Sequence, residues 1–396
     1  MAPRPVHVGK FFPPPHAGVE AHVDTLLRSM IGRAEPTLVA GLTPGRSLAG
    51  EALPYRAVPV PAFGRIASVT VSPGVVGAVQ AQLRSGRANL LHIHAPNPWG
   101  DWAALAVAPT VPVVLSWHSD IVRQKKLLAL YRGVQRRVLR RVDRIIVFTP
   151  MHYSSSEQLH QLDVADKVEI VPMGIDTSRF DVVARAPLPE TLERFVAGKT
   201  LVLTIGRHVY YKGYEQLIDA FASVDPKAAL VMVGAGPLTT ALQQRIDANG
   251  LGARVRLVGE VGDATLISLL HRCDVFTLPS IEPSEAFGIA AAEAMACGKP
   301  TVVCELGNGV NFLNQAGRTS LVVPPRDVPA LSAAIDRLVS DQSLRRELGE
   351  RGRRRIRDEF SLEIMAERTL RIYESLLHQR GSARSSASRP ALADTP

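Results

Sequence analysis

Apolar residues occur along the chain in two kinds of run. Short apolar runs bounded by polar or glycine-rich turns predict buried strands, and longer segments with apolar residues three or four positions apart predict amphipathic helices. Each half of the chain has six strand candidates: 6–9, 38–40, 90–94, 111–116, 145–148 and 168–171 in the first, and 200–205, 230–233, 255–259, 275–278, 301–304 and 321–323 in the second. Helical or loop segments separate these strands. The pattern therefore predicts an α/β protein with two doubly wound parallel sheets.

Chain length and the positions of proline-containing segments predict where the domains end. At 396 residues the chain is too long for one typical core, so two domains are expected. We predict a first domain over 1–180, a proline-containing linker over 181–199 and a second domain over 200–360. A last helix follows over 361–380. The Ser/Ala/Arg/Pro-rich segment 381–396 is predicted to be a disordered tail.

The bulk composition is that of a soluble globular protein, with 46% hydrophobic and 21% charged residues. Cys273, Cys297 and Cys304 have no CxxC spacing, which indicates thiols of a reducing compartment and no zinc site. The N-terminus lacks the pattern of a signal peptide, and the most apolar window, 103–115, is short and broken by prolines. We therefore expect a cytoplasmic protein.

The net charge of +9 and the pI near 9.7 indicate an anionic partner. Nucleic acid is the weakest candidate, because aromatic residues make up only 5% and no zinc finger or RNP motif is present. Anionic lipid and phosphorylated substrates remain. Nine basic residues lie between Arg123 and Arg144, beside an apolar side of leucines and valines. This segment predicts either a helix on an anionic membrane surface or a solvated helix that packs its apolar side on the sheet.

The most informative stretch is 278–300, which reads LPSIEPSEAFGIAAAEAMACGKP. A strand breaks at Pro279, an acidic loop follows, and an Ala-rich helix ends in Gly-Lys-Pro. The N-terminus of such a helix favours a phosphate. Glu285 and Glu293 are eight residues apart, too far to share one metal ion. They could hold two ends of an extended ligand through its hydroxyls, or be a capping carboxylate and a solvated helix residue.

Two further loops follow strands of the second half. Arg207 and Lys212 flank a glycine-bounded loop after strand 200–205, where they could neutralise a diphosphate or be ordinary surface charge. The loop after strand 230–233 contains Gly234 and Gly236, but the third position of a dinucleotide fingerprint holds Thr239. That fingerprint therefore fails, and we expect a tight turn into a helix.

Taken together, these motifs resemble a known family. Glu285 and Glu293 with their surroundings resemble the E-x7-E signature of retaining glycosyltransferases of family 4, and 206–213 resembles the diphosphate clamp G-R-x4-K-G of that family. The N-terminal segment around Gly18 resembles the family's phosphate-facing loop, with Ala17 in place of its first glycine. The turn V-P-M-G-I-D resembles the family's PNGVD turn, with Met173 in place of asparagine.

The resemblance implies the GT-B fold, in which two Rossmann-like domains face each other across a cleft and the C-terminal helix crosses back to the N-terminal domain. The nucleotide sugar would bind mainly to the second domain and the acceptor to the first. By resemblance, Glu285 contacts donor-sugar hydroxyls and Glu293 holds the ribose, while His118, which follows a strand of the first domain, positions the sugar. Gly18 and the amides at Phe287 and Gly288 would complete the donor site.

The implied reaction is retaining glycosyl transfer without a metal or other cofactor, since no D-x-D pair occurs in the chain. Arg207 and Lys212 would stabilise the leaving diphosphate. The variant motifs look most like those of bacterial O-antigen mannosyl- and rhamnosyltransferases that use GDP-mannose or GDP-rhamnose in lipopolysaccharide biosynthesis, with a saccharide or lipid-linked acceptor. Alternatives are a UDP-sugar donor, an epimerase or inverting enzyme on the same fold, and a non-catalytic sugar-nucleotide sensor.

Overall fold

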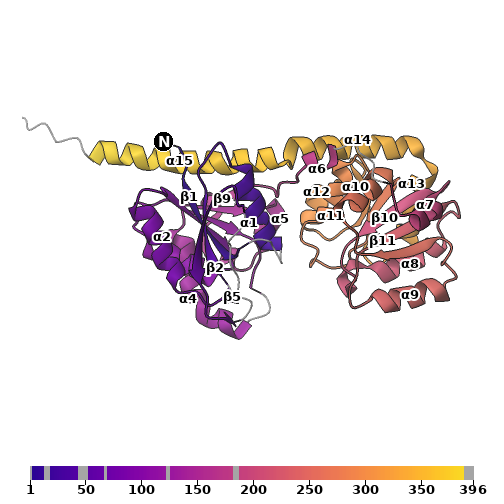
Figure 1. Ribbon diagram of the computed structural model, residues 1–396, viewed down its shortest axis with the longest axis horizontal. Coiled ribbons are helices and arrows are strands. Elements are labelled where there is room, and N and C mark those ends of the chain that lie inside the picture. Colours follow the sequence, from indigo (N-terminus) through magenta and orange to yellow (C-terminus); the bar gives the residue numbers. More distant parts are fainter. Residues whose placement is uncertain are drawn as a thin grey trace, which may run out of the picture. The chain divides into compact units, whose positions relative to one another are not determined.

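The computed structural model describes residues 2–12, 18–42, 52–66, 69–121, 125–181 and 187–387. The chain forms two compact units, one made of Met1–Gly174 with Leu362–Pro396 and the other of Ile175–Ser361. Each unit contains a parallel sheet with helices on both of its faces (Figure 1). The prediction of two doubly wound, Rossmann-like domains is confirmed.

The main sheet of the first unit has seven parallel strands in the order β3-β2-β1-β6-β7-β8-β9. The strand order reverses between β1 and β6, as in doubly wound sheets. A short antiparallel pair, β4-β5, forms a separate sheet in this unit. The strands are β1 (Pro5–Phe11), β2 (Thr37–Leu42), β3 (Arg56–Pro61), β4 (Arg65–Ile66), β5 (Val69–Thr70), β6 (Leu90–Ala95), β7 (Val113–Trp117), β8 (Arg144–Val147) and β9 (Val168–Ile170).

Side chains from alternate strand positions form two cores in this unit. One core packs the sheet against α2, α3 and α4, and the other packs it against α1 and α15. The helices are α1 (Gly18–Ser29), α2 (Gly74–Arg84), α3 (Pro98–Ala106), α4 (Lys125–Arg141), α5 (Pro150–Ser154) and α15 (Leu362–Ala387), with the 3-10 turns η1 (Leu159–Gln161) and η2 (Ala165–Lys167).

Strand β3 is absent from the sequence prediction, which has six strands in this half. Its residues include Pro59 and Pro61, and proline cannot donate a hydrogen bond within a sheet. The structure places β3 at the edge of the sheet, where it pairs only with β2 among the described strands. An edge position tolerates proline because one side of the strand needs no partner.

Helix α4 carries most of the basic segment. Val138 and Leu139 are buried in the core beneath the sheet, which agrees with the prediction of a helix packing its apolar side. Four arginines of its described part are exposed: Arg132, Arg136, Arg137 and Arg140. Arg123 lies outside the described residues. The exposed arginines are the charges that this helix would present to an anionic membrane surface.

The second unit has six parallel strands in the order β12-β11-β10-β13-β14-β15. All six strands predicted for this half are present, and the order reverses between β10 and β13. They are β10 (Thr200–Ile205), β11 (Ala228–Val233), β12 (Val255–Gly259), β13 (Val275–Leu278), β14 (Thr301–Cys304) and β15 (Ser320–Val323).

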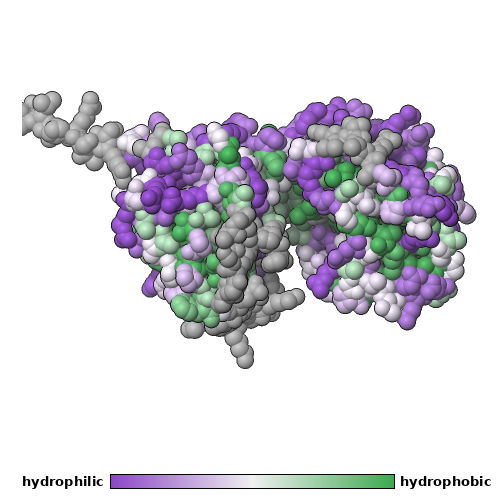
Figure 2. Space-filling view, viewed as in Figure 1, coloured by the Kyte–Doolittle hydropathy of each residue, from purple (hydrophilic) through white to green (hydrophobic). Residues whose placement is uncertain are grey.

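The helices of the second unit cover both faces of its sheet. Residues of α8, α9 and α13 form the large core on one face, and α10 and α11 contact β10, β13 and β14. Hydrophilic residues line α14 on its outer side (Figure 2). The elements are α6 (Ser178–Asp181), α7 (Glu190–Val196), η3 (Tyr210–Lys212), α8 (Tyr214–Ala222), α9 (Thr239–Ala248), α10 (Asp263–Arg272), α11 (Ile289–Ala296), α12 (Gly309–Leu313), α13 (Val328–Ser340) and α14 (Gln342–Glu359).

Three predicted boundaries differ from the structure. The first unit ends at Gly174, six residues before the predicted limit of 180. The segment predicted as the linker 181–199 contains α7, which buries Leu192, Phe195 and Val196 at helical spacing. The tail predicted from 381 begins too early, because α15 continues to Ala387. The Ser/Ala composition there has no helix-breaking proline before Pro390.

Helix α15 belongs to the first unit and packs against α1 and one face of its sheet. This confirms the prediction that the C-terminal helix crosses back to the N-terminal domain. Among the described helices, none combines the length and apolar content needed to cross a membrane.

Candidate active site

Three of the residues predicted to bind the donor follow two neighbouring strands of the second sheet. Arg207 and Lys212 follow β10, and Glu285 follows β13, and these are the two strands between which the strand order reverses. In open α/β sheets, ligands bind outside the carboxyl ends of the strands at this reversal. The topology therefore brings together residues that the sequence separates by more than seventy positions.

Lys212 and Glu285 form an ion pair at this reversal. The Lys212 Nζ atom lies 2.5 Å from the Glu285 Oε2 atom, and both side chains are only 12% exposed. The Ser280 hydroxyl donates a second hydrogen bond to the same carboxylate oxygen, at 3.0 Å. Glu285 is therefore held by two partners, Lys212 from the loop after β10 and Ser280 from its own loop after β13.

Glycine is required where this loop packs against its neighbours. Gly213, directly after Lys212, has φ +67°, and a Cβ atom there would lie 2.0 Å from the carbonyl oxygen of Pro279. The loop after β10 thus touches the loop after β13 backbone to backbone. Only a glycine allows both this contact and the left-handed conformation.

The acidic loop is fixed to the start of α12. Asn308 Nδ2 donates to the backbone carbonyl of Glu285 at 2.8 Å. Helix α11 then begins after Gly288, which has φ +80°. The Phe287 side chain is buried and packs near Phe360. At Phe287 and Gly288, a ligand would therefore meet the backbone and no side chain.

Glu293 lies on α11 and is paired with an arginine that the sequence analysis did not select. Arg179 Nη1 lies 3.6 Å from Glu293 Oε1, and Arg179 Nη2 lies 3.3 Å from Asp263 Oδ2. Burial raises the pKa of the Glu293 carboxyl, while Arg179 acts in the opposite direction. No contact between Glu285 and Glu293 is present among the described residues, which fits two separate points of attachment.

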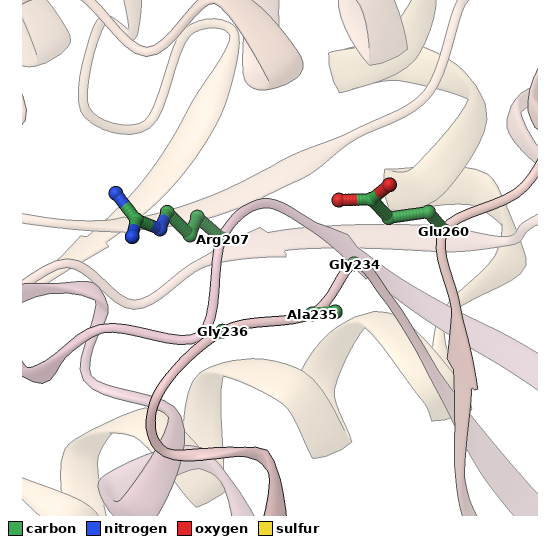
Figure 3. Close-up of a pocket in the computed structure, with 5 residues that line it drawn as sticks. All are labelled: Arg207, Gly234, Ala235, Gly236 and Glu260. Carbon is green, nitrogen blue, oxygen red and sulfur yellow. The ribbon is translucent and has the colours of Figure 1, made fainter.

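Arg207 lines a pocket of about 400 Å³ at the carboxyl ends of β10, β11 and β12. Its other lining residues are Gly234, Ala235, Gly236 and Glu260. Figure 3 shows the side chains of Arg207 and Glu260 on the same side of the glycine turn. The pocket therefore offers a cation and a carboxylate above a stretch of backbone that carries almost no side chain.

The glycines of this turn serve packing between loops. A Cβ atom at Gly234 would lie 2.2 Å from the carbonyl oxygen of Gly206, and one at Gly236 would lie 2.6 Å from that of His208. The amide of Gly236 donates to the Thr239 hydroxyl at 3.0 Å, and α9 begins at Thr239. The predicted tight turn into a helix is confirmed.

Gly18 and His118 belong to the first unit. Gly18 is the first residue of α1, whereas Ala17 lies outside the described residues. His118 follows β7, and its amide donates to the carbonyl of Ala95 at 3.1 Å. Its ring lies among those of His22, His94 and Phe148, at centroid distances of 5.1, 5.4 and 5.0 Å.

Sequence reasoning missed three partners of Glu285 and Glu293, which are Ser280, Asn308 and Arg179, and it missed Glu260, which lines the same pocket as Arg207. Ser280 lies within the stretch 278–300 but was not selected, and the other three belong to no motif that we used and become visible only when the strand order is known. The sequence did contain a signal for another group of residues, the histidines of the first sheet. His92 and His94 are two positions apart on a strand and so share a face, a pattern that marks a polar cluster inside a sheet.

Two family descriptions cover most of the chain. Residues 16–179 match the description "Glycosyltransferase Family 4", and residues 193–355 match "Glycosyl transferases group 1". O-antigen chain mannosyltransferase C of Escherichia coli is 32% identical over 74% of this chain and 76% of its own. D-rhamnosyltransferase WbpZ of Pseudomonas aeruginosa is 34% identical over 70% and 71%. Phosphatidyl-myo-inositol mannosyltransferase of Mycobacterium leprae is 31% identical over 91% and 93%.

Solved structures agree on the fold. A glycosyltransferase from Rickettsia africae superposes with a TM-score of 0.75 at 18% identity, over 95% of this chain and 99% of its own. Anabaena HepE in complex with UDP gives a TM-score of 0.72 at 18% identity, over 94% and 100%. The two family matches, the relatives above 30% identity and these folds lead to one conclusion: the chain belongs to the group 1 glycosyltransferases and has the GT-B fold.

Proposed function

We propose that the protein transfers a hexose or deoxyhexose, with retention of anomeric configuration, from a nucleotide diphosphate sugar to a saccharide or lipid-linked acceptor. The observation that carries this proposal is the Lys212–Glu285 pair at the strand reversal, with Arg207 in the same loop after β10 as Lys212. A cation for the diphosphate and a carboxylate for sugar hydroxyls stand there at hydrogen-bond distance from each other.

In the proposed reaction, the acceptor oxygen attacks the anomeric carbon on the face that the diphosphate leaves. The bond from this carbon to the β-phosphate oxygen breaks, and the acceptor proton passes to the departing diphosphate. Arg207, Lys212 and the amides around Phe287 and Gly288 stabilise the charge that develops there. Preorganised donors of this kind typically contribute about 3–4 kcal/mol each. Because cations and amides supply this stabilisation, we propose a metal-independent reaction.

Three residues position the donor in this proposal. Glu285 accepts hydrogen bonds from sugar hydroxyls, and Glu293 accepts from the ribose hydroxyls. A partly protonated Glu293 would accept these bonds less well, so Arg179, which lowers the carboxyl pKa, supports the role. His118, from the first unit, contacts the sugar.

For the donor, we propose GDP-mannose or GDP-rhamnose. Two relatives named above are an O-antigen chain mannosyltransferase and a D-rhamnosyltransferase, which supports these sugars. The UDP bound to Anabaena HepE keeps a UDP-sugar as the alternative. The proposed setting is O-antigen or lipopolysaccharide synthesis at the cytoplasmic face of a membrane.

The proposal for the acceptor rests on the positive charge of the first unit. The exposed arginines of α4 give the first unit a basic surface, which suits an anionic or lipid-linked acceptor held at an anionic membrane. The relative named phosphatidyl-myo-inositol mannosyltransferase supports a lipid acceptor.

Calorimetric titration of the purified protein with GDP, UDP and ADP tests the proposal, first without metal and then with EDTA. Tight binding of GDP alone, unaffected by EDTA, is the expected result. Preference for UDP would replace the donor and keep the mechanism, whereas loss of binding in EDTA would overturn metal independence. A donor-hydrolysis assay then separates an enzyme from a sugar-nucleotide sensor, since only an enzyme releases free sugar.

A further inference from the structure

Three neighbouring strands of the first unit carry polar side chains on one face. His7, His92, His94 and Ser116 lie on β1, β6 and β7 and are each at most 1% exposed. The residues that alternate with them point to the opposite, apolar core: Val6, Val8, Leu91, Ile93, Val113 and Leu115. In register, His7 lies beside His92, and His94 lies beside Ser116. Helix α15 adds Tyr373, which is fully buried.

These side chains form one unbranched row of hydrogen bonds that ends at His118. Every ring nitrogen of the three buried strand histidines takes part in it. The contacts run from Ser116 Oγ to His92 Nε2 (2.8 Å), from His92 Nδ1 to the Tyr373 hydroxyl (2.5 Å), from that hydroxyl to His7 Nε2 (3.3 Å), from His7 Nδ1 to His94 Nε2 (3.1 Å), and from His94 Nδ1 to His118 Nε2 (3.1 Å).

The four histidines are neutral in this row. Burial lowers the pKa of His7 to about 3 and lowers the pKa values of His92, His94 and His118 well below their usual range. A neutral imidazole has one N–H group and one bare nitrogen. Each ring therefore accepts on one side and donates on the other. The Tyr373 oxygen could accept from both His92 and His7, but its own buried proton would then have no acceptor in the row, which is costly. The whole row therefore has two possible directions.

Ser116 selects between the two directions. Within the described part of the chain, its hydroxyl has one partner, His92 Nε2. If His92 donated to Ser116, the buried hydroxyl proton would have no acceptor, and an unmet buried donor is costly. Ser116 therefore donates, and the direction passes through Tyr373, His7 and His94 to His118.

We propose that this row holds His118 as the Nδ1–H tautomer, with its bare Nε2 turned into the protein. His118 then presents a hydrogen-bond donor and cannot act as a general base through Nδ1. Ser116, Tyr373 and the three strand histidines are positioning residues. That the bond donated by His118 reaches an oxygen of the nucleotide sugar rests on the proposed function.

A metal ion is the competing occupant. His7, His92 and His94 each offer a ring nitrogen within 4.8 Å of the others. However, all six nitrogens of these rings already have partners in the row. The rings of His92 and His94 are also stacked, with centroids 4.5 Å apart and planes at 18°, so their in-plane lone pairs point along nearly parallel planes and do not converge.

Nuclear magnetic resonance of protein labelled with 15N in the histidine rings tests the proposal directly. Long-range 1H–15N correlations distinguish the two tautomers, and His118→Gln identifies the His118 signals. The expected result is four Nδ1–H tautomers, at His7, His92, His94 and His118. Four Nε2–H tautomers would show the opposite direction and overturn the proposal. Stoichiometric zinc in the purified protein would overturn it as well.

Variants test whether the row acts on the reaction. Tyr373→Phe interrupts it, and we expect a mixture of tautomers at His118 and a kcat lower by about tenfold or more with donor KM nearly unchanged, because a wrong tautomer removes a bond needed in the transition state. Ser116→Ala removes the directing hydroxyl, and Ser116→Thr, its matched control, restores it. An unchanged His118 spectrum in both Tyr373→Phe and Ser116→Ala contradicts the proposed row.

The spectra need no substrate, so they separate this inference from the proposed function. Four Nδ1–H tautomers in a protein without transferase activity would support the row and remove the transferase proposal. An active transferase with Nε2–H at His118 would support the transferase proposal and overturn the proposed row.

Discussion

Lys212 and Glu285 join the loops that follow β10 and β13, with the ammonium nitrogen 2.5 Å from a carboxylate oxygen. The pair therefore links the carboxyl ends of the two strands between which the strand order of the second sheet reverses. Both groups are mostly shielded from water, so each depends on the other for its charge to be tolerated.

Glu285→Gln should therefore affect both stability and catalysis. We expect a loss of about 1–3 kcal/mol in the free energy of unfolding, because the largely buried Lys212 side chain loses its charged hydrogen-bond partner. We expect kcat to fall by roughly 10²–10³, as when one preorganised group is removed. Urea unfolding and initial rates measure the two effects.

The Arg245–Asp219 pair provides a matched control for this variant. It has the same 2.5 Å separation but side chains 42% and 30% exposed. Asp219→Asn should cost less than about 1 kcal/mol, as for a surface pair, and leave kcat unchanged. Equal losses in both variants would mean that the Lys212–Glu285 pair has no special role.

Arg207→Ala and Glu293→Ala should separate into different kinetic classes. Arg207 is proposed to act on the charge that develops on the leaving group, so its removal should mainly lower kcat. Glu293 is proposed to hold the ribose in ground and transition states alike, so its removal should mainly raise donor KM. Arg346→Ala, an exposed arginine of α14, should change neither constant. The reverse assignment of kcat and KM effects would refute these roles.

Gly213→Ala and Gly250→Ala test the close approach of the two loops. The backbone conformations are nearly the same, with φ +67° and +65°, but a Cβ atom meets the Pro279 carbonyl at Gly213 and nothing within 4 Å at Gly250. Gly250→Ala should cost about 1 kcal/mol from backbone strain alone. Gly213→Ala should cost clearly more and should lower GDP affinity. Similar losses of stability would exclude the contact.

Stability should fall steeply in mild acid. Five histidines of the first unit have pKa values strongly lowered by burial: His7 to about 3, His22 to about 4, and His92, His94 and His118 well below the usual range. Below pH 6.5 the unfolded chain binds protons that the folded protein does not, so stability decreases as the pH falls from 6.5 toward 3. Each histidine contributes about 1.4 kcal/mol per pH unit in this window.

Urea midpoints measured between pH 7.5 and about 4.5 check this dependence, in the window where histidine titrates when exposed. His22→Leu removes one of the five groups and should flatten the curve. His378→Gln, at an exposed position on α15, should leave its slope unchanged. A midpoint that stays constant down to pH 5 would show that the buried histidines are protonated in the folded state.

The basic surface of α4 should bind anionic membranes in a salt-dependent way. Changing the four exposed arginines of α4 to glutamine should weaken binding to anionic liposomes by about 1 kcal/mol per residue at low salt. The matched control changes four exposed arginines of α14, which removes the same charge: Arg346, Arg351, Arg353 and Arg354. Co-sedimentation compares the two. If the unchanged protein does not bind, or if both variants lose affinity equally, membrane contact through α4 is excluded.

The sequence predicted what depends on local pattern. Strands such as 200–205 were readable because they are continuous apolar runs, and α11 because alanines precede a Gly-Lys-Pro stop. Strand β3 was missed because its prolines argue against a strand unless its edge position is known. Helix α7 was missed because flanking prolines resemble a linker.

The charged residues of the candidate site could be selected from the sequence, whereas the residues that contact them could not. Arg207, Lys212, Glu285 and Glu293 belong to motifs of fixed spacing. The Arg179–Glu293 contact joins residues more than a hundred positions apart, and the row of histidines joins three strands to a helix at the other end of the chain. Such pairings depend on strand order, which hydrophobic periodicity alone does not specify.

The first unit is assembled from two separate stretches of chain, with the whole second unit between them. During synthesis, the face of its sheet that contains Leu90, Val114 and Ile146 emerges from the ribosome long before the Met365, Leu370 and Tyr373 that cover it. The second unit is continuous and can fold as soon as Ser361 is available. The second unit, in the middle of the chain, should therefore complete its folding before the first unit does. A nascent chain that stops at Ser361 should expose an apolar surface that chaperones recognise.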